Sequence, residues 1–95
     1  MREETTQEKI IAVAIKSRRS GIVYYLDAPA RHHNVIQIMP VVGSGPRRER
    51  GTQGFLTSSG RFVDRSEGLV IAKAANQIIR RCGGDDEELF SENLW

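Results

Sequence analysis

The chain has 95 residues, of which 39% are hydrophobic and 27% are charged, and its formal net charge is +2. This composition excludes a wholly disordered chain, and the length allows one domain whose stability as a monomer would be marginal. No apolar run reaches the roughly 18 residues that cross a bilayer, and the acidic start is unlike a secretory signal. The single cysteine, Cys82, excludes an intrachain disulfide. We therefore expect one cytoplasmic domain over residues 1–95.

Arginine is the dominant cation of the chain, whereas acid gathers near the two ends. The planar guanidinium group suits bidentate contacts to phosphate better than the ammonium group of lysine does. The arginine excess therefore has two interpretations, a solvated charged face or a phosphate-binding surface. A domain that binds a nucleic acid polymer usually has a stronger basic imbalance, so such a polymer is not the expected partner.

The first predicted elements form a hairpin after a loose, polar segment at residues 1–8. Residues 10–15 read Ile-Ile-Ala-Val-Ala-Ile and are apolar on both faces, as in a central strand that is covered on both sides. Residues 17–21 are typical of a turn, and residues 22–26 are rich in β-forming side chains. The two runs therefore predict a pair of strands joined by a short loop.

A helix is expected from about residue 30 to residue 39. Asp27 would offer its carboxylate to the free N–H groups at the helix start, and Pro29 is typical of the first turn. Pro40 would end the helix, because its ring clashes with the preceding turn. The apolar face of this helix would comprise Val35, Ile36 and Met39.

Residues 43–52 contain glycine, proline and four charged side chains, which predicts an exposed loop. The pattern of the first half then repeats. A strand is expected at residues 53–57, a tight turn at 58–60 and a short return strand at 61–63.

Asp64 and Glu67 have the spacing of a capping box, so a second helix would start at Asp64 and run to about Ile79. Arg80 and Arg81 would lie in its last turn, where positive charge complements the helix dipole. Gly83 and Gly84 would end it. Its core face would comprise Leu69, Ala72, Ala75 or Asn76, and Ile79.

The last segment, residues 83–95, carries bulky apolar side chains that would be unusual on a free end, so we expect it to dock on this subunit or on a neighbour. The predicted fold class is α+β, a small antiparallel or mixed sheet in β-β-α-β-β-α order with two helices and an apolar C-terminal tail.

Arg31, His32 and His33 fall in the first turn of the first predicted helix. A helix start with free N–H groups favours anions, and an arginine with two imidazoles strengthens that preference. His32 also shares a face with the apolar residues of this helix, so a partly buried histidine at the edge of the core is the competing interpretation.

Metal binding and catalysis are both disfavoured by the residues present. Adjacent histidines point about 100° apart on a helix, and no CxxC or HxxxH spacing occurs. The chain also lacks a GxSxG elbow and a Walker loop. We therefore expect neither a metal nor a cofactor, and a binding protein rather than an enzyme.

A second cluster surrounds the second predicted hairpin. Phe55 would offer an aromatic face to a base and Asp64 a carboxylate to ribose hydroxyls. Positive charge for phosphates would come from the arginines that flank this hairpin and its helix, Arg61, Arg65, Arg80 and Arg81. These are the usual parts of a nucleotide pocket. The competing interpretation is that Phe55 belongs to the core and Asp64 only caps a helix.

Four segments together resemble a known family. They read Ala-Ile-Lys (14–16), Pro-Ala-Arg-His-His-Asn-Val-Ile (29–36), Gln-Gly-Phe-Leu-Thr-Ser-Ser-Gly-Arg-Phe-Val-Asp-Arg (53–65) and Leu-Phe-Ser-Glu-Asn-Leu-Trp (89–95). The family is that of the first-described phage anti-Thoeris proteins, which sequester cyclic ADP-ribose signals of bacterial immunity. The resemblance spans nearly the whole chain.

The resemblance implies a protein that acts in the host bacterial cytoplasm and binds glycocyclic ADP-ribose without cleaving it. It implies a homodimer, or a hexamer of three dimers with a second class of pocket for cyclic oligonucleotides. Phe55 would stack on the ligand, Asp64 would make a polar contact, and Arg80 or Arg81 would bind phosphate. Arg31 and His32 would suit the second pocket.

Two other functions remain open from the sequence. One is a small arginine-rich inhibitor that binds a host protein or a nucleic acid. The other is a phosphodiesterase that uses a histidine as general acid, and it predicts turnover of the ligand.

Overall fold

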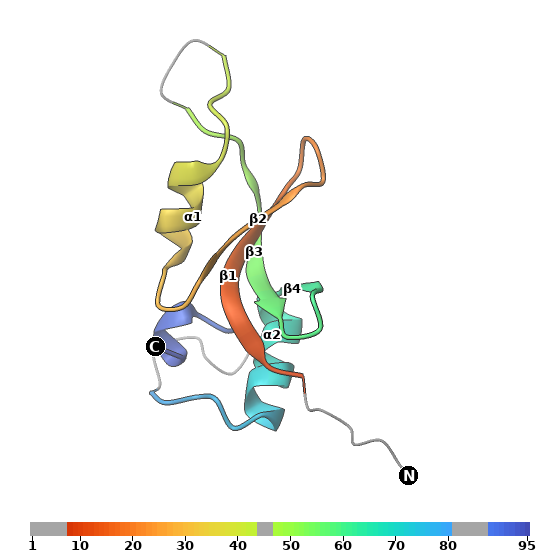
Figure 1. The fold of residues 1–95 in the computed structure, drawn as a ribbon, viewed down its shortest axis with the longest axis vertical. Coiled ribbons are helices and arrows are strands. Elements are labelled where there is room, and N and C mark those ends of the chain that lie inside the picture. The colour runs from red at the N-terminus through yellow and green to blue at the C-terminus, as the bar shows by residue number, and fades with distance from the viewer. Residues whose placement is uncertain (1–7, 44–46, 81–87) are drawn as a thin grey trace.

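The computed structural model describes residues 8–43, 47–80 and 88–95, and Figure 1 shows their arrangement. One four-stranded antiparallel sheet carries two helices, in the strand order β2-β1-β3-β4. The predicted α+β class and the β-β-α-β-β-α order are both confirmed. The elements are β1 (Ile10–Ser17), β2 (Val23–Asp27), α1 (His32–Ile38), β3 (Gly51–Thr57), β4 (Phe62–Asp64), α2 (Arg65–Ala74) and the short 3-10 helix η1 (Ser91–Asn93).

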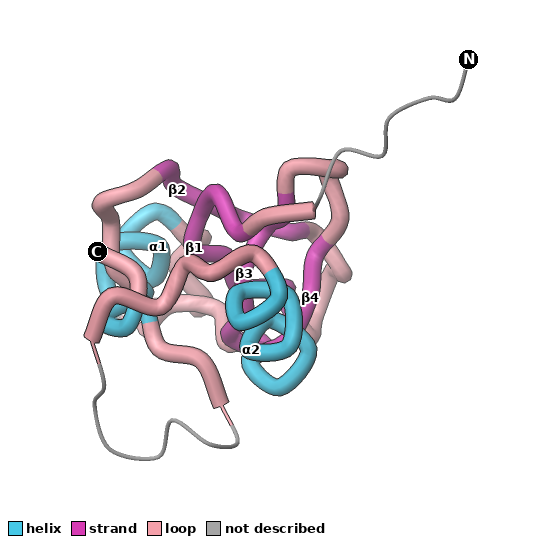
Figure 2. Tube along the Cα trace, turned by 90° about the horizontal axis from the view of Figure 1, so that it is seen from below, coloured by secondary structure: helices cyan, strands magenta, loops and turns pink. Residues whose placement is uncertain are grey.

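The helices and the C-terminal segment lie on one side of the sheet (Figure 2). Strand β1 is internal, and its side chains at Val13 and Ile15 face the core, which also takes Phe55 from β3. Ala12 and Ala14 point to the opposite face, where no helix of the described chain lies, and yet they are fully buried. A methyl group on an internal strand is short enough to be enclosed by its longer neighbours, so the apolar character of both faces did not require a second layer of helices.

Helix α1 begins two residues later than the sequence predicts. Arg31 is its N-cap residue, and the Arg31 N–H donates to Oδ1 of Asn34 at 2.9 Å. Asp27 is therefore not the cap but the last residue of β2, and Pro29 lies in the intervening turn, after a cis peptide bond. The predicted apolar face is confirmed, because Val35 and Met39 are buried and the remaining member packs against the core.

Strand β3 starts at Gly51, inside the segment that the composition predicts as a loop. A close approach between strands explains the glycine, because a Cβ at this position would collide with the carbonyl group of Lys16 on β1. Val41 and Arg48 form an isolated antiparallel bridge before the strand, outside the four-stranded sheet, so part of this segment pairs with the residues that follow α1.

Helix α2 starts as predicted, with Oδ1 of Asp64 accepting from the N–H of Glu67 at 2.8 Å. It ends at Ala74, however, and the predicted extension to Ile79 is wrong. Asn76 adopts a left-handed conformation with φ of 58°, which stops the helix, and Ile79 is 60% exposed instead of facing the core. Arg80 therefore lies outside any helix, and Arg81 lies outside the described residues.

A pair of hydrogen bonds from Gln77 explains where the chain goes after α2. Its side chain accepts from the N–H of Ile10 at 2.8 Å and donates to the carbonyl oxygen of the same residue at 2.9 Å. These bonds fasten the segment after the helix to the start of β1. A continued helix would carry Gln77 away from that strand.

The C-terminal segment returns to the core. Leu89 is fully buried and Leu94 is 7% exposed, while the indole N–H of Trp95 donates to the carbonyl oxygen of Ala30 at 2.9 Å. The segment thus packs beside the start of α1, on this subunit. Across the described residues, no helix is long and apolar enough to span a membrane.

Candidate anion-binding site

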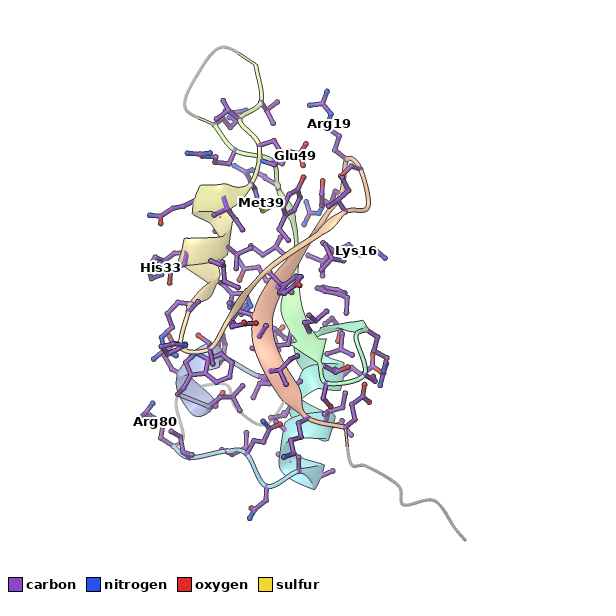
Figure 3. All side chains as sticks on the ribbon, in the orientation of Figure 1. Lys16, Arg19, His33, Met39, Glu49 and Arg80 are labelled. Carbon is purple, nitrogen blue, oxygen red and sulfur yellow. The ribbon has the colours of Figure 1, made fainter. Side chains whose placement is uncertain are left out.

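Five arginines from two distant stretches of sequence meet at one end of the molecule. The turn between β1 and β2 contributes two, and the segment that leads into β3 contributes three. The backbone N–H of Arg18 donates to the carbonyl oxygen of Arg50 at 3.0 Å, which joins the two stretches directly. Figure 3 shows Arg19 and Glu49 at this end, beyond Met39. The arginine cluster comprises Arg18, Arg19, Arg47, Arg48 and Arg50.

A cavity of about 410 Å³ opens beneath this cluster. Its floor is apolar and comes from β1 and α1, through Ile15, Ile36 and Met39. Its remaining walls are four of the five clustered arginines with Glu49, Gly51 and Gln53. A second hollow of about 340 Å³ lies over the same loop and adds Arg19 and Val42. A concave surface with an apolar floor and a few convergent polar groups is the usual form of a small-molecule site.

The guanidinium groups of the arginine cluster are mostly free to bind a ligand. Nη1 of Arg48 donates to the carbonyl oxygen of Met39 at 3.0 Å, which fixes that side chain at the end of α1. Within the described part of the chain, the other four guanidinium groups make neither a hydrogen bond nor an ion pair. All five side chains are exposed. The cluster therefore offers many N–H donors and up to five positive charges to an anion.

A third cavity, of about 440 Å³, adjoins the first through Arg18, Gly51 and Gln53. It extends to the start of α2, where Asp64, Arg65 and Ser66 line it. The Arg65 side chain donates to Oε1 of Gln53 at 2.6 Å and stacks on the ring of Phe90, with the guanidinium carbon 4.8 Å from the ring centre. Its Nε is buried without a hydrogen-bond partner among the described residues.

Phe55 and His32 are in contact, but inside the core. The two rings form an edge-to-face pair with centroids 5.1 Å apart, and Phe55 is fully buried. Alternation along β3 directs Phe55 to the face that the helices cover, so its ring offers no surface for a base in this structure. The prediction that Phe55 stacks on a ligand is not supported by this geometry.

His32 is 8% exposed, and its Nε2 donates to the carbonyl oxygen of Gly54 at 2.7 Å. Burial lowers the pKa of this imidazole, and the nearby positive charge of Arg65 lowers it further, although the hydrogen bond to Gly54 acts in the opposite direction. The geometry matches the interpretation of His32 as a buried histidine. Arg31 beside it is partly buried, and its Nη1 has no hydrogen-bond partner among the described residues.

Arg61 is engaged by two carboxylates at the turn between β3 and β4. It makes two hydrogen bonds to Glu8, at 2.8 and 2.9 Å, and one to Glu67 at 2.8 Å. These bonds raise the pKa of Arg61, and they lower the pKa of Glu8 to about 2. Glu67 therefore pairs with Arg61 in place of completing the predicted capping box. Phosphate binding by Arg61 would have to displace two carboxylates.

Arg80 holds the C-terminal segment, since its Nη1 donates to the backbone oxygens of Glu92 at 2.9 Å and Trp95 at 3.3 Å. Of the predicted ligand-binding residues that the structure describes, only Asp64 and Arg65 line one of the three cavities, and both line the third. The described residues contain no group of three or more potential metal ligands.

The arginine cluster is not predicted by the local sequence pattern, although a signal for it is present. Residues 18–19 fall in a predicted turn and residues 47–50 in a predicted exposed loop. Pairing the first long strand with the third would have placed both stretches at the same end of the sheet, because Ser17 lies opposite Gly51. The missing information was the strand order, which no local pattern specifies.

Fold and site together define a small α+β protein with an arginine-lined cavity at the open end of its sheet. The family model described as "Phage T4 y16D protein" matches residues 9–95. The chain therefore belongs to this family of phage proteins. No curated protein and no solved structure matches it.

Proposed function

We propose that this phage protein binds a small cyclic nucleotide that serves as a bacterial immune signal, and sequesters it without cleavage. The observation that carries the proposal is the cavity beneath the arginine cluster, because four clustered arginines line a single concave surface with an apolar floor. Such a surface suits a ligand that combines phosphates with a nucleoside.

Sequestration, as opposed to turnover, is supported by the position of the buried imidazole. His32 already donates its Nε2 proton to the carbonyl oxygen of Gly54, and it does not line any of the three cavities. A general acid has to reach the bond that breaks. The proposed protein needs only affinity, which convergent charge-assisted hydrogen bonds supply.

The particular ligand class follows from the resemblance to the anti-Thoeris sequestering proteins. We propose glycocyclic ADP-ribose first and cyclic oligonucleotides second, bound in the host cytoplasm by a homodimer or by a hexamer of three dimers. Asp64 supports this ligand class, because the resemblance implies a ligand contact at this residue and its side chain lines the third cavity together with Arg18.

A second candidate function is an inhibitor that binds a host protein or a nucleic acid through the same arginines. The exposure of all five arginine side chains favours this second function. Salt separates the two functions, because a polyanion releases counterions on binding and loses affinity steeply as salt rises. A nucleotide held in a cavity would lose much less affinity.

The first experiment is isothermal titration of the protein with glycocyclic ADP-ribose and with a cyclic trinucleotide. We expect tight binding of one of them and recovery of the ligand intact after denaturation. Replacing Arg18 or Arg50 with alanine should weaken binding by about tenfold or more, since each removes charge-assisted hydrogen bonds to phosphate.

The matched control is Lys73→Ala, which removes the same charge from an exposed position on α2. The affinity of this variant for the ligand should equal that of the unmodified protein. If folded protein gives no binding heat with glycocyclic ADP-ribose and none with the cyclic trinucleotide, the proposed function is contradicted. Recovery of a cleaved ligand would point to the phosphodiesterase.

A further inference from the structure

One carboxylate stands among the clustered arginines. Glu49 lies between Arg48 and Arg50 in the sequence and lines both the 410 Å³ cavity and the 340 Å³ hollow. It is half-buried, whereas its arginine neighbours are exposed. A carboxylate in an anion-binding site opposes the binding of an anion. Glu49 would therefore need a role other than attraction of phosphate.

The Glu49 side chain is held in place by Ser17. Its Oε1 accepts from Oγ of Ser17 at 2.8 Å, and the same Oγ accepts from the N–H groups of Arg19 at 3.1 Å and Ser20 at 3.2 Å. Ser17 is 2% exposed, so this hydroxyl is fixed by the turn between β1 and β2. The Glu49 N–H donates to the carbonyl oxygen of Pro40 at 2.9 Å, which holds the backbone as well.

The second carboxylate oxygen of Glu49 has no hydrogen-bond partner in the described chain, and neither oxygen forms an ion pair there with a clustered arginine. The cavity therefore contains one fixed hydrogen-bond acceptor, the Glu49 carboxylate, among the N–H donors of the arginine cluster. A bare anion would be attracted by the arginines and repelled by Glu49. A ligand that carries O–H or N–H groups beside its phosphates would gain a hydrogen bond from the same carboxylate.

We propose that Glu49 is a specificity-determining residue, which selects ligands with a hydrogen-bond donor beside their phosphates and rejects inorganic polyphosphates. The donor would be a ribose hydroxyl or an amino group of a base. This inference rests on the proposed function, because it assigns selectivity to the same cavity. Such selectivity matters for a sequestering protein, since a site built only of arginines would fill with free phosphates.

The test compares two probes, ADP-ribose and inorganic pyrophosphate, by isothermal titration of the full chain. Both carry two linked phosphates, but only ADP-ribose carries ribose hydroxyls and a base. Glu49→Gln removes the charge and keeps an oxygen that accepts from Ser17. We expect pyrophosphate to bind this variant about tenfold more tightly, with ADP-ribose affinity changing less than threefold. The preference for ADP-ribose would therefore fall several-fold.

The amide group of glutamine could itself donate a hydrogen bond to pyrophosphate, and Glu49→Ala controls for this because alanine removes the charge without adding a donor. Both variants should reduce the preference for ADP-ribose over pyrophosphate. Tighter pyrophosphate binding by the glutamine variant alone would overturn the inference. Glu67→Gln removes the same charge next to Arg61, outside the three cavities, and should leave the preference unchanged. Circular dichroism and thermal unfolding establish that each variant folds.

The outcomes distinguish this inference from the proposed function. If ADP-ribose binds and the Glu49 variants leave the ratio of the two affinities unchanged, the inference fails and the nucleotide site stands. If neither probe binds the unmodified protein or the Glu49 variants, the inference fails, and titration with the two cyclic ligands decides the proposed function separately.

Discussion

At the residue scale, the ion pair between Glu8 and Arg61 joins the start of the described chain to the turn between β3 and β4. Glu8 accepts two hydrogen bonds from Arg61 and a third, at 2.5 Å, from the hydroxyl of Ser59. These partners favour the charged carboxylate, which is why the pKa of Glu8 falls from its usual value of 4.5 to about 2.

The lowered pKa makes the contribution of Glu8 to stability dependent on pH. A carboxylate with a depressed pKa in the folded state stabilises the fold above its usual pKa, and that contribution is lost as the pH falls toward 2. Glu8→Gln should therefore lower the melting temperature at pH 7. The difference from the unmodified protein should shrink between pH 4.5 and pH 2. A constant difference across this range would contradict the assignment.

At the element scale, the end of α2 shows how a tertiary contact overrides a helical pattern. The helical periodicity of the sequence continues to Ile79, but the helix stops at Ala74. Asn76 accepts a left-handed backbone more readily than most residues do, and Gln77 then bonds both backbone groups of Ile10. The two features together redirect the chain along the edge of the core.

Gln77→Ala should destabilise the fold by about 1–3 kcal/mol, because it leaves a donor and an acceptor of the backbone without partners. Urea denaturation measures the change in the free energy of unfolding. Gln37, which is exposed on α1, provides the matched control, and its replacement by alanine should change stability by about 0.5 kcal/mol or less. Equal effects of the two substitutions would show that the bonds of Gln77 contribute nothing.

At the scale of the whole molecule, the C-terminal segment completes the core between the two helices. Leu89 belongs to the same hydrophobic cluster as Phe55 and Leu69, and a Cβ on Gly68 of α2 would lie 3.4 Å from its side chain. The two arginine stretches lie at the opposite end of the sheet, where the described elements leave the edge of the core open. One end of the molecule is therefore closed by the C-terminal segment, and the other end is open and carries the arginine cluster.

This separation predicts that the core and the arginine cluster respond independently to substitution. Leu89→Ala should destabilise the fold by about 2–5 kcal/mol, since it creates a cavity in the core. Val70→Ala is the control, because Val70 is 68% exposed. Ligand affinity at a temperature where both variants are folded should match that of the unmodified protein. Weakened binding by folded Leu89→Ala would show that the two ends are coupled.

Local sequence patterns were sufficient to predict the element order, the antiparallel pairing within each hairpin, the Asp64 cap and the apolar face of α1. Each depends on residues within a few positions of one another, where periodicity and capping chemistry are decisive. The end of α2, the burial of Phe55 and His32, and the convergence of the two arginine stretches follow from contacts between distant parts of the chain. These features depend on which distant strands pair and on which face a helix covers, and no local pattern of residues carries that information.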